Sequence, residues 1–77
     1  MPMLDAYIPE GALSHGAEQA LMSELTDLLL HHEGADPADP RARAIAWVFL
    51  HRPAAVYVAG EPAAEPRYRI VASVPEG

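Results

Sequence analysis

The 77-residue sequence predicts an α/β fold of the two-layer α+β type: a β-α-β unit, a short extra strand, and a last strand that opens a second repeat. Three features lead to this prediction. Leucines recur at helical spacing between residues 14 and 32, and "AIAWVFL" (44–50) has the composition of a buried strand. The stretch "AYIPEG" (6–11) also returns as "ASVPEG" (72–77), 66 residues later, which indicates a structural repeat.

The first strand and the helix follow from local signals. Residues 2–8, "PMLDAYI", are mostly apolar and end in β-formers, and "PEG" then predicts a turn. Ser14 can cap the N-terminus of the helix, and Gly34 can end it. The expected apolar stripe of the helix consists of Ala17, Leu21, Leu25, Leu28, Leu29 and His32.

The second half of the chain predicts strands joined by turn-rich segments. "ADPADPR" (35–41) has the composition of a loop, and residues 44–50 are expected to form a strand covered on both faces. "VYVAG" (56–60) predicts a short strand, "EPAAEP" (61–66) a connection, and "RYRIVASV" (67–74) the last strand. Strand, helix and strand in this order predict a parallel, right-handed crossover, and a ferredoxin-like or other two-layer sandwich is the alternative.

The repeat divides the chain into residues 1–66, one complete β-α-β unit, and residues 67–77, the first strand of an incomplete second unit. A chain of this length buries a modest share of its surface, and it has no Cys for disulfides. One helix covers one face of the sheet, so we expect further copies of the chain to cover Trp47 and Phe49 on the other face. The sequence therefore predicts a homo-oligomer, either a trimer or a hexamer.

The net charge of −6 and its distribution limit the partners. Residues 1–40 hold eight acidic side chains and no Lys or Arg, which argues against nucleic acid, because phosphate binding needs a basic surface. His31 and His32 are adjacent and diverge on a helix, so we expect no metal and no cofactor. No stretch has the features of a membrane span or a signal peptide, so the sequence predicts a cytoplasmic protein without a membrane partner.

All basic residues other than His are arginines in the second half of the chain. They are Arg41, Arg43, Arg52, Arg67 and Arg69. They form either solvated strand ends or an electropositive pocket for a small anion, because Arg makes bidentate contacts with carboxylates. Arg43 and Arg52 flank the second strand and are the candidate ligands of a small carboxylate substrate.

Pro2 is the candidate catalytic residue. Removal of Met1 would turn its nitrogen from an amide into a basic secondary amine. At the end of a buried strand, desolvation disfavours the charged ammonium and lowers its pKa toward neutrality. Such an amine can act as a general base or nucleophile at working pH.

These features together resemble the tautomerase superfamily, the group of 4-oxalocrotonate tautomerase. The resemblance is carried by Pro2, the strand "MLDAYIPEG" (3–11), the helix that follows, the strand "AIAWVFLHRP" (44–53) and "VYVAG" (56–60). It implies β-α-β units arranged as hexamers of single units or trimers of fused pairs. The returned "ASVPEG" makes the chain similar to the first half of fused-pair members such as cis-3-chloroacrylic acid dehalogenase.

The resemblance implies an isomerase, a keto-enol tautomerase of small 2-oxo or 2-hydroxy-unsaturated acids with Pro2 as general base. Tyr57 would line the pocket and His51 would lie near it, although a packed strand aromatic is the alternative for Tyr57. Ala12 and Ala46 stand where the archetype has arginines that hold substrate carboxylates. Two alternatives therefore remain: hydration or dehalogenation of unsaturated acids with Pro2 as acid, and a non-catalytic assembly subunit.

Overall fold

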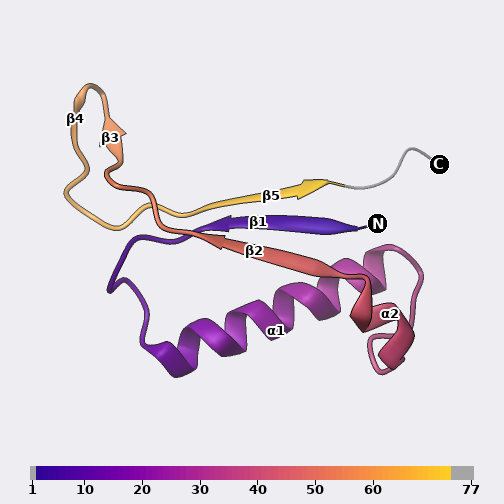
Figure 1. The fold of residues 1–77 in the computed structure, drawn as a ribbon. Coiled ribbons are helices and arrows are strands. Elements are labelled where there is room, and N and C mark those ends of the chain that lie inside the picture. Colours follow the sequence, from indigo (N-terminus) through magenta and orange to yellow (C-terminus); the bar gives the residue numbers. More distant parts are fainter. Residues whose placement is uncertain (1, 74–77) are drawn as a thin grey trace.

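A three-stranded sheet and one long helix form the two layers of the structure, a computed structural model that describes residues 2–73 (Figure 1). In chain order the elements are β1 (Met3–Tyr7), α1 (His15–His32), α2 (Pro40–Ala44), β2 (Trp47–His51), β3 (Tyr57–Val58), β4 (Glu61–Pro62) and β5 (Arg69–Ser73). The structure thus confirms the mixed α/β class. Within the described range no helix is long and apolar enough to cross a membrane.

β1 is the central strand of the sheet, whose order is β2-β1-β5. β2 runs parallel to β1, with Met3 opposite Trp47 and Tyr7 opposite His51. β5 runs antiparallel on the other side of β1. α1 and α2 lie between β1 and β2 in the chain, and α1 covers one face of the sheet (Figure 1).

Side chains of β1 alternate between the two faces of the sheet, as the pleat of a strand requires. Leu4 and Ala6 of β1, with Ile8 directly after it, are buried, whereas Met3, Asp5 and Tyr7 are only half-buried. Leu29 and Leu30 of α1 complete the buried apolar core of the described residues. The core therefore lies between β1 and the C-terminal half of α1.

Both ends of α1 follow the predicted capping signals. The Ser14 side chain accepts a hydrogen bond from Ala17 N at 3.1 Å, which satisfies one of the free donors of the first turn. At the other end Gly34 has φ +76°, its N–H bonds to His31 O at 3.1 Å, and Ala35 N–H bonds to Leu30 O at 2.9 Å. This pair of bonds is the Schellman arrangement, and it confirms Gly34 as the end of the helix.

The predicted apolar stripe of α1 is wrong in part. Ala17, Leu28 and His32 are exposed, whereas Glu18 and Leu30 are buried. Glu18 faces the sheet because Arg52 pairs with its carboxylate there, and apolar periodicity cannot reveal an ion pair of this kind.

The loop predicted at residues 35–41 runs into a short helix, α2. Asp39 caps it by accepting a hydrogen bond from Arg41 N at 3.0 Å, and Pro40 occupies its first turn. Because α2 takes up the chain as far as Ala44, β2 begins at Trp47 and the predicted strand start at residue 44 is wrong. Trp47 and Phe49 are 48% and 43% exposed, so β2 is not covered on both faces within one chain.

The connection predicted at residues 61–66 is also wrong in part, because Glu61 and Pro62 form β4 and pair with β3. Ala59 and Gly60 join the two strands with φ values of +55° and +80°. Positive φ at both central residues is the geometry of a tight hairpin turn. The hairpin extends from the sheet at the end where β1 stops (Figure 1).

The last strand falls within the predicted range. The bounds of β5, Arg69–Ser73, are those of β1 displaced by 66 residues, which is the offset of the sequence repeat. The pairing sets Asp5, the middle residue of β1, opposite Val71, the middle residue of β5. The "VPEG" part of the repeat (74–77) lies outside the described residues, and the division into units at residue 66 stays a prediction.

The C-terminal cap of α1 generates a first prediction. Gly34→Ala should lower the free energy of unfolding by about 1 kcal/mol, because an L side chain at φ +76° is strained. Gly16→Ala is the matched control: this glycine lies in the first turn of α1 with no atom close to an added Cβ, so stability should stay equal or rise. Urea unfolding of both variants measures the difference. Equal effects at the two positions would contradict the capping argument.

Candidate functional site

Pro2 lies buried immediately before the central strand. Its carbonyl oxygen accepts a hydrogen bond from Trp47 N at 3.4 Å, which anchors it to the start of β2. On its other side β1 pairs with the end of β5, where Met3 lies opposite Ser73. Pro2 therefore lies at the end of the sheet where β1 and β2 begin and β5 ends.

The other predicted site residues divide between the two ends of the sheet. Arg43 belongs to α2, which leads into the start of β2 and so lies toward the Pro2 end (Figure 1). His51 pairs with Tyr7 at the far end of β1, about 13 Å along the strand from Met3. Arg52 follows His51, and Tyr57 is 63% exposed in the hairpin beyond it. Within one chain, the structure does not bring Pro2 together with His51, Arg52 or Tyr57.

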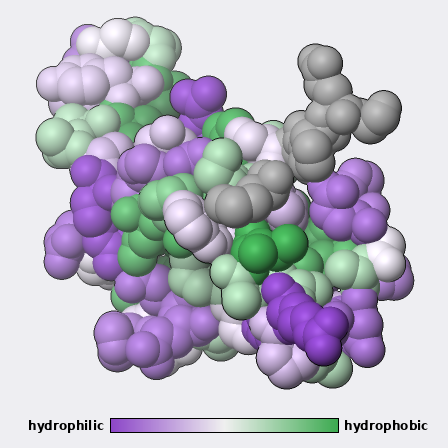
Figure 2. All heavy atoms as spheres, turned by 45° about the vertical axis from the view of Figure 1, so that its right-hand side comes forward, coloured by the Kyte–Doolittle hydropathy of each residue, from purple (hydrophilic) through white to green (hydrophobic). Residues whose placement is uncertain are grey.

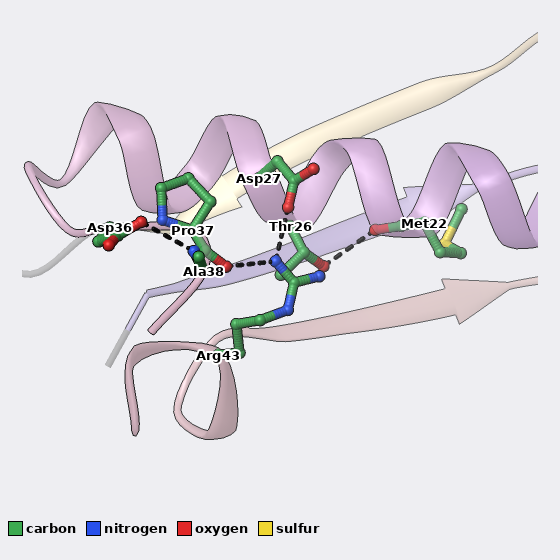
Figure 3. A network of polar contacts seen from close by, with 7 residues as sticks. All are labelled: Met22, Thr26, Asp27, Asp36, Pro37, Ala38 and Arg43. Carbon is green, nitrogen blue, oxygen red and sulfur yellow. Dashed lines mark hydrogen bonds and ion pairs between the residues drawn. The ribbon is translucent and has the colours of Figure 1, made fainter. Parts of the chain in front are cut away.

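Arg43 ties α2 and the preceding loop to α1 (Figure 3). Its Nη1 donates to Asp27 Oδ1 at 2.6 Å and to the Pro37 carbonyl at 2.8 Å. In the same network Ala38 N donates to Asp36 Oδ1 at 2.9 Å and stabilises the turn. The geometry thus gives Arg43 a structural role, and its role toward a substrate stays a prediction.

Arg52 joins α1 to the sheet at the end of the interface where α1 begins and β1 stops. Its Nη1 lies 2.7 Å from Glu18 Oε1 and its Nη2 lies 2.9 Å from Glu18 Oε2, so the pair is bidentate. Nη1 also donates to the Ile8 carbonyl at 3.1 Å, and Nε lies 3.3 Å from the exposed Glu10 carboxylate. This guanidinium joins the first turn of α1 to the ends of β1 and β2. Its role toward a substrate stays a prediction.

The Arg52 pair changes the acidity of its partner. The hydrogen bond from Arg52 lowers the pKa of Glu18 below its ordinary value of 4.5, against a smaller opposing effect of desolvation. The same bond raises the pKa of Arg52 above its already high value. Glu18 therefore stays ionised in the folded chain at neutral pH and somewhat below pH 4.5.

A second polar cluster lies on the sheet face away from α1, at the end where β1 stops. His51 Nε2 lies 2.7 Å from Asp5 Oδ1, and the His51 ring stacks on Tyr7 with centroids 4.3 Å apart and planes 13° apart. The guanidinium carbon of Arg69 lies 5.6 Å from the centre of the Tyr7 ring, on its face. A histidine oriented by a carboxylate can hold or move a proton, and an arginine beside it can attract an anion.

Sequence reasoning singled out His51 and named Arg69 among the five arginines of a possible anion pocket, but it missed Asp5 and Tyr7. Their convergence depends on register: Tyr7 lies opposite His51 on one side and opposite Arg69 on the other. The spacing of Asp5 and Tyr7 was an available signal, because residues two apart in a strand share a face. No three His, Cys, Asp or Glu side chains among residues 2–73 are grouped as metal ligands.

Comparisons of the chain with known protein families, with curated proteins and with solved structures find no match. The resemblance to the tautomerase superfamily therefore rests on the residues and elements described above.

The ion pair of Glu18 predicts how stability depends on acidity. Because its pKa is lowered by folding, the pair stabilises the chain above pH 4.5, and this contribution is lost as the pH falls below that value. Glu18→Gln should therefore reduce stability at neutral pH and flatten the further loss between neutral pH and about pH 3. Urea unfolding across this range measures both effects.

Glu24→Gln is the matched control, because Glu24 is an exposed residue of α1 with no ion pair among residues 2–73. It should leave the pH profile unchanged. A Glu18→Gln profile parallel to that of the unmodified chain would contradict the assignment.

Proposed function

We propose that this chain belongs with the tautomerases and transfers a proton on small 2-oxo or 2-hydroxy-unsaturated acids, with Pro2 as the base. The observation that carries the proposal is the position of Pro2, which is buried directly before the central strand and between the start of β2 and the end of β5. The parallel pairing of β1 with β2, with α1 between them in the chain, agrees with the β-α-β unit that the tautomerase resemblance implies.

The proposed chemistry needs the free nitrogen of Pro2, and so the removal of Met1. A buried secondary amine loses part of its hydration, which lowers its pKa and leaves a fraction neutral at working pH. The neutral amine takes the proton of the enol oxygen while the carbonyl forms, and the resulting ammonium returns a proton to the carbon. The step conserves atoms and charge and needs no cofactor.

The proposed site requires more than one unit. Arg43, one of the two arginines of α2, is already bonded to Asp27 and Pro37, so it is not free to hold a substrate carboxylate, and a second unit would add donors to the exposed Arg41. Because β5 is antiparallel to β1, the C-terminal end of β5 lies at the Pro2 end of the sheet. A second unit, fused or from another copy, can therefore complete the site. Arginines that hold the substrate carboxylate are therefore not needed at positions 12 and 46, where this chain has Ala12 and Ala46.

Exposed apolar surface favours association of copies (Figure 2). Trp47 and Phe49 contact each other edge to face, with centroids 6.1 Å apart, on the sheet face that α1 does not cover. On the opposite face a hollow of about 370 Å³ lies between α1 and β5, lined by Leu4, Leu25, Leu28, Leu29, His32 and Ala72. We propose a trimer or hexamer that covers these surfaces. An assembly subunit without catalysis is the second candidate function, because it needs these same surfaces and no free Pro2 nitrogen.

Substitution of Pro2 tests the catalytic proposal. Pro2→Ala should lower kcat/KM for the ketonisation of phenylenolpyruvate by about 10²- to 10⁴-fold, which is the usual contribution of a general base. The absorbance of the enol follows the reaction, and the intact mass of the same sample reports whether Met1 has been removed.

Pro66→Ala is the matched proline substitution, in the exposed connection before β5, and should leave turnover unchanged. Retention of Met1 in an active preparation, or unchanged turnover of Pro2→Ala, would exclude Pro2 as the base. Absence of turnover by the unmodified, processed oligomer would favour the assembly subunit.

Substitution of Trp47, one of the two exposed aromatic residues of β2, tests the proposed oligomer. Sedimentation velocity at micromolar concentration should give a trimer or hexamer for the unmodified chain and smaller species for Trp47→Glu, because a carboxylate on a buried interface is costly. Tyr57→Glu changes another exposed aromatic residue, in the hairpin, and should leave the assembly intact. A folded, monodisperse monomer of the unmodified chain would contradict the prediction.

A further inference from the structure

A second candidate site lies at the opposite end of β1 from Pro2. A hollow of about 250 Å³ opens where β1 ends and β5 begins, and it is lined by Tyr7, Pro53, Val56, Arg67, Tyr68 and Arg69. We refer to these six residues as the arginine pocket. Every residue of the pocket lies within the described part of the chain. The pocket therefore needs no further unit to form its walls.

The charge of the arginine pocket is unusual for this chain. The protein carries eleven acidic residues and five arginines, so carboxylate partners are plentiful. Nevertheless, Arg67 and Arg69 form no ion pair with any residue between 2 and 73, whereas Arg43 and Arg52 both do. The lining contains two guanidinium groups and no carboxylate. Two guanidinium groups that line one hollow and have no carboxylate partner among residues 2–73 can bind an external anion.

The walls of the pocket limit the shape of that anion. Two tyrosines, a valine and a proline supply flat, largely apolar surface around the guanidinium groups. The volume of about 250 Å³ is just below the range of pockets for drug-sized ligands, so it suits a small molecule. A planar carboxylic acid with an aromatic or unsaturated body satisfies both the cations and the walls.

One wall of the pocket, formed by Tyr7 and Arg69, is held in place before any ligand binds. Asp5 fixes His51 at 2.7 Å, His51 stacks on Tyr7, and Arg69 lies over the Tyr7 ring at 5.6 Å. Arg69 and Tyr7 are opposite each other in the antiparallel pairing, so the backbone sets their separation. Preorganised groups lose little conformational entropy on binding.

We propose that the arginine pocket binds small planar carboxylates, with Arg69 and Arg67 holding the carboxylate and Tyr7 and Tyr68 contacting its apolar body. This binding site is separate from the proton transfer proposed at Pro2 and does not depend on it.

Benzoate is the probe and benzamide is its neutral isostere. Titration of the full chain, followed by the NMR shifts of Tyr7, His51 and Arg69, should give saturable binding of benzoate and much weaker binding of benzamide. Arg69→Gln should weaken benzoate at least about tenfold, since charged hydrogen bonds contribute that much. Arg69→Lys should also weaken it, because lysine keeps the charge but loses the planar fork.

Arg41→Gln is the matched control. Arg41 is equally exposed, has no ion pair among residues 2–73, and lies in α2 near the other end of the sheet. Its loss should leave benzoate binding unchanged, and so should Pro2→Ala. No saturable binding of benzoate, equal binding of benzamide, or equal weakening by Arg41→Gln would overturn the proposal. Tighter binding of inorganic phosphate than of benzoate would also overturn it, since the apolar walls would then contribute nothing. Thermal unfolding of each variant checks that its fold is retained.

Discussion

The pairing of β1 on both of its sides is the constraint on which the rest of the structure depends. Its backbone groups are satisfied by β2 and by β5, so its side chains face only the two surfaces of the sheet. Leu4 and Ala6 face α1 and form the core, whereas Asp5 and Tyr7 face away from α1. One short strand therefore determines both what the helix covers and which polar groups stay accessible.

Each face of the sheet carries a polar cluster at the end of β1. Toward α1, the Arg52–Glu18 pair replaces apolar contact and joins the helix to the sheet. Away from α1, the Asp5–His51 contact and the stacked Tyr7 ring organise the wall of the arginine pocket. The Glu18 carboxylate of this pair is buried whereas the Arg52 side chain is 38% exposed, so the guanidinium reaches the helix from the surface at the junction of three elements.

Local sequence signals predicted the elements well and their contacts poorly. Ser14 and Gly34 mark the ends of α1 because capping is decided within a few residues. α2 was missed although Asp39 and Pro40 carry its start signal, since the turn composition of the segment masked it. The division of the predicted site between two ends of the sheet, and the arginine pocket itself, depend on strand register. Register is set by packing between distant segments, which a single sequence does not display.

The repeat relates the two ends of the sheet to each other. β1 and β5 have bounds 66 residues apart and pair antiparallel about their middle residues, so the start of each lies beside the end of the other. The residue 66 positions after Pro2 is Tyr68, an internal residue that cannot carry a free amine. One end of the pair therefore holds the candidate base, while the equivalent end holds Arg67, Tyr68 and Arg69 in a pocket without one. If the predicted repeat is real, the two ends of the pair differ in the groups that they carry. The carboxylate binding proposed for the arginine pocket would then stand without the base that is proposed at Pro2.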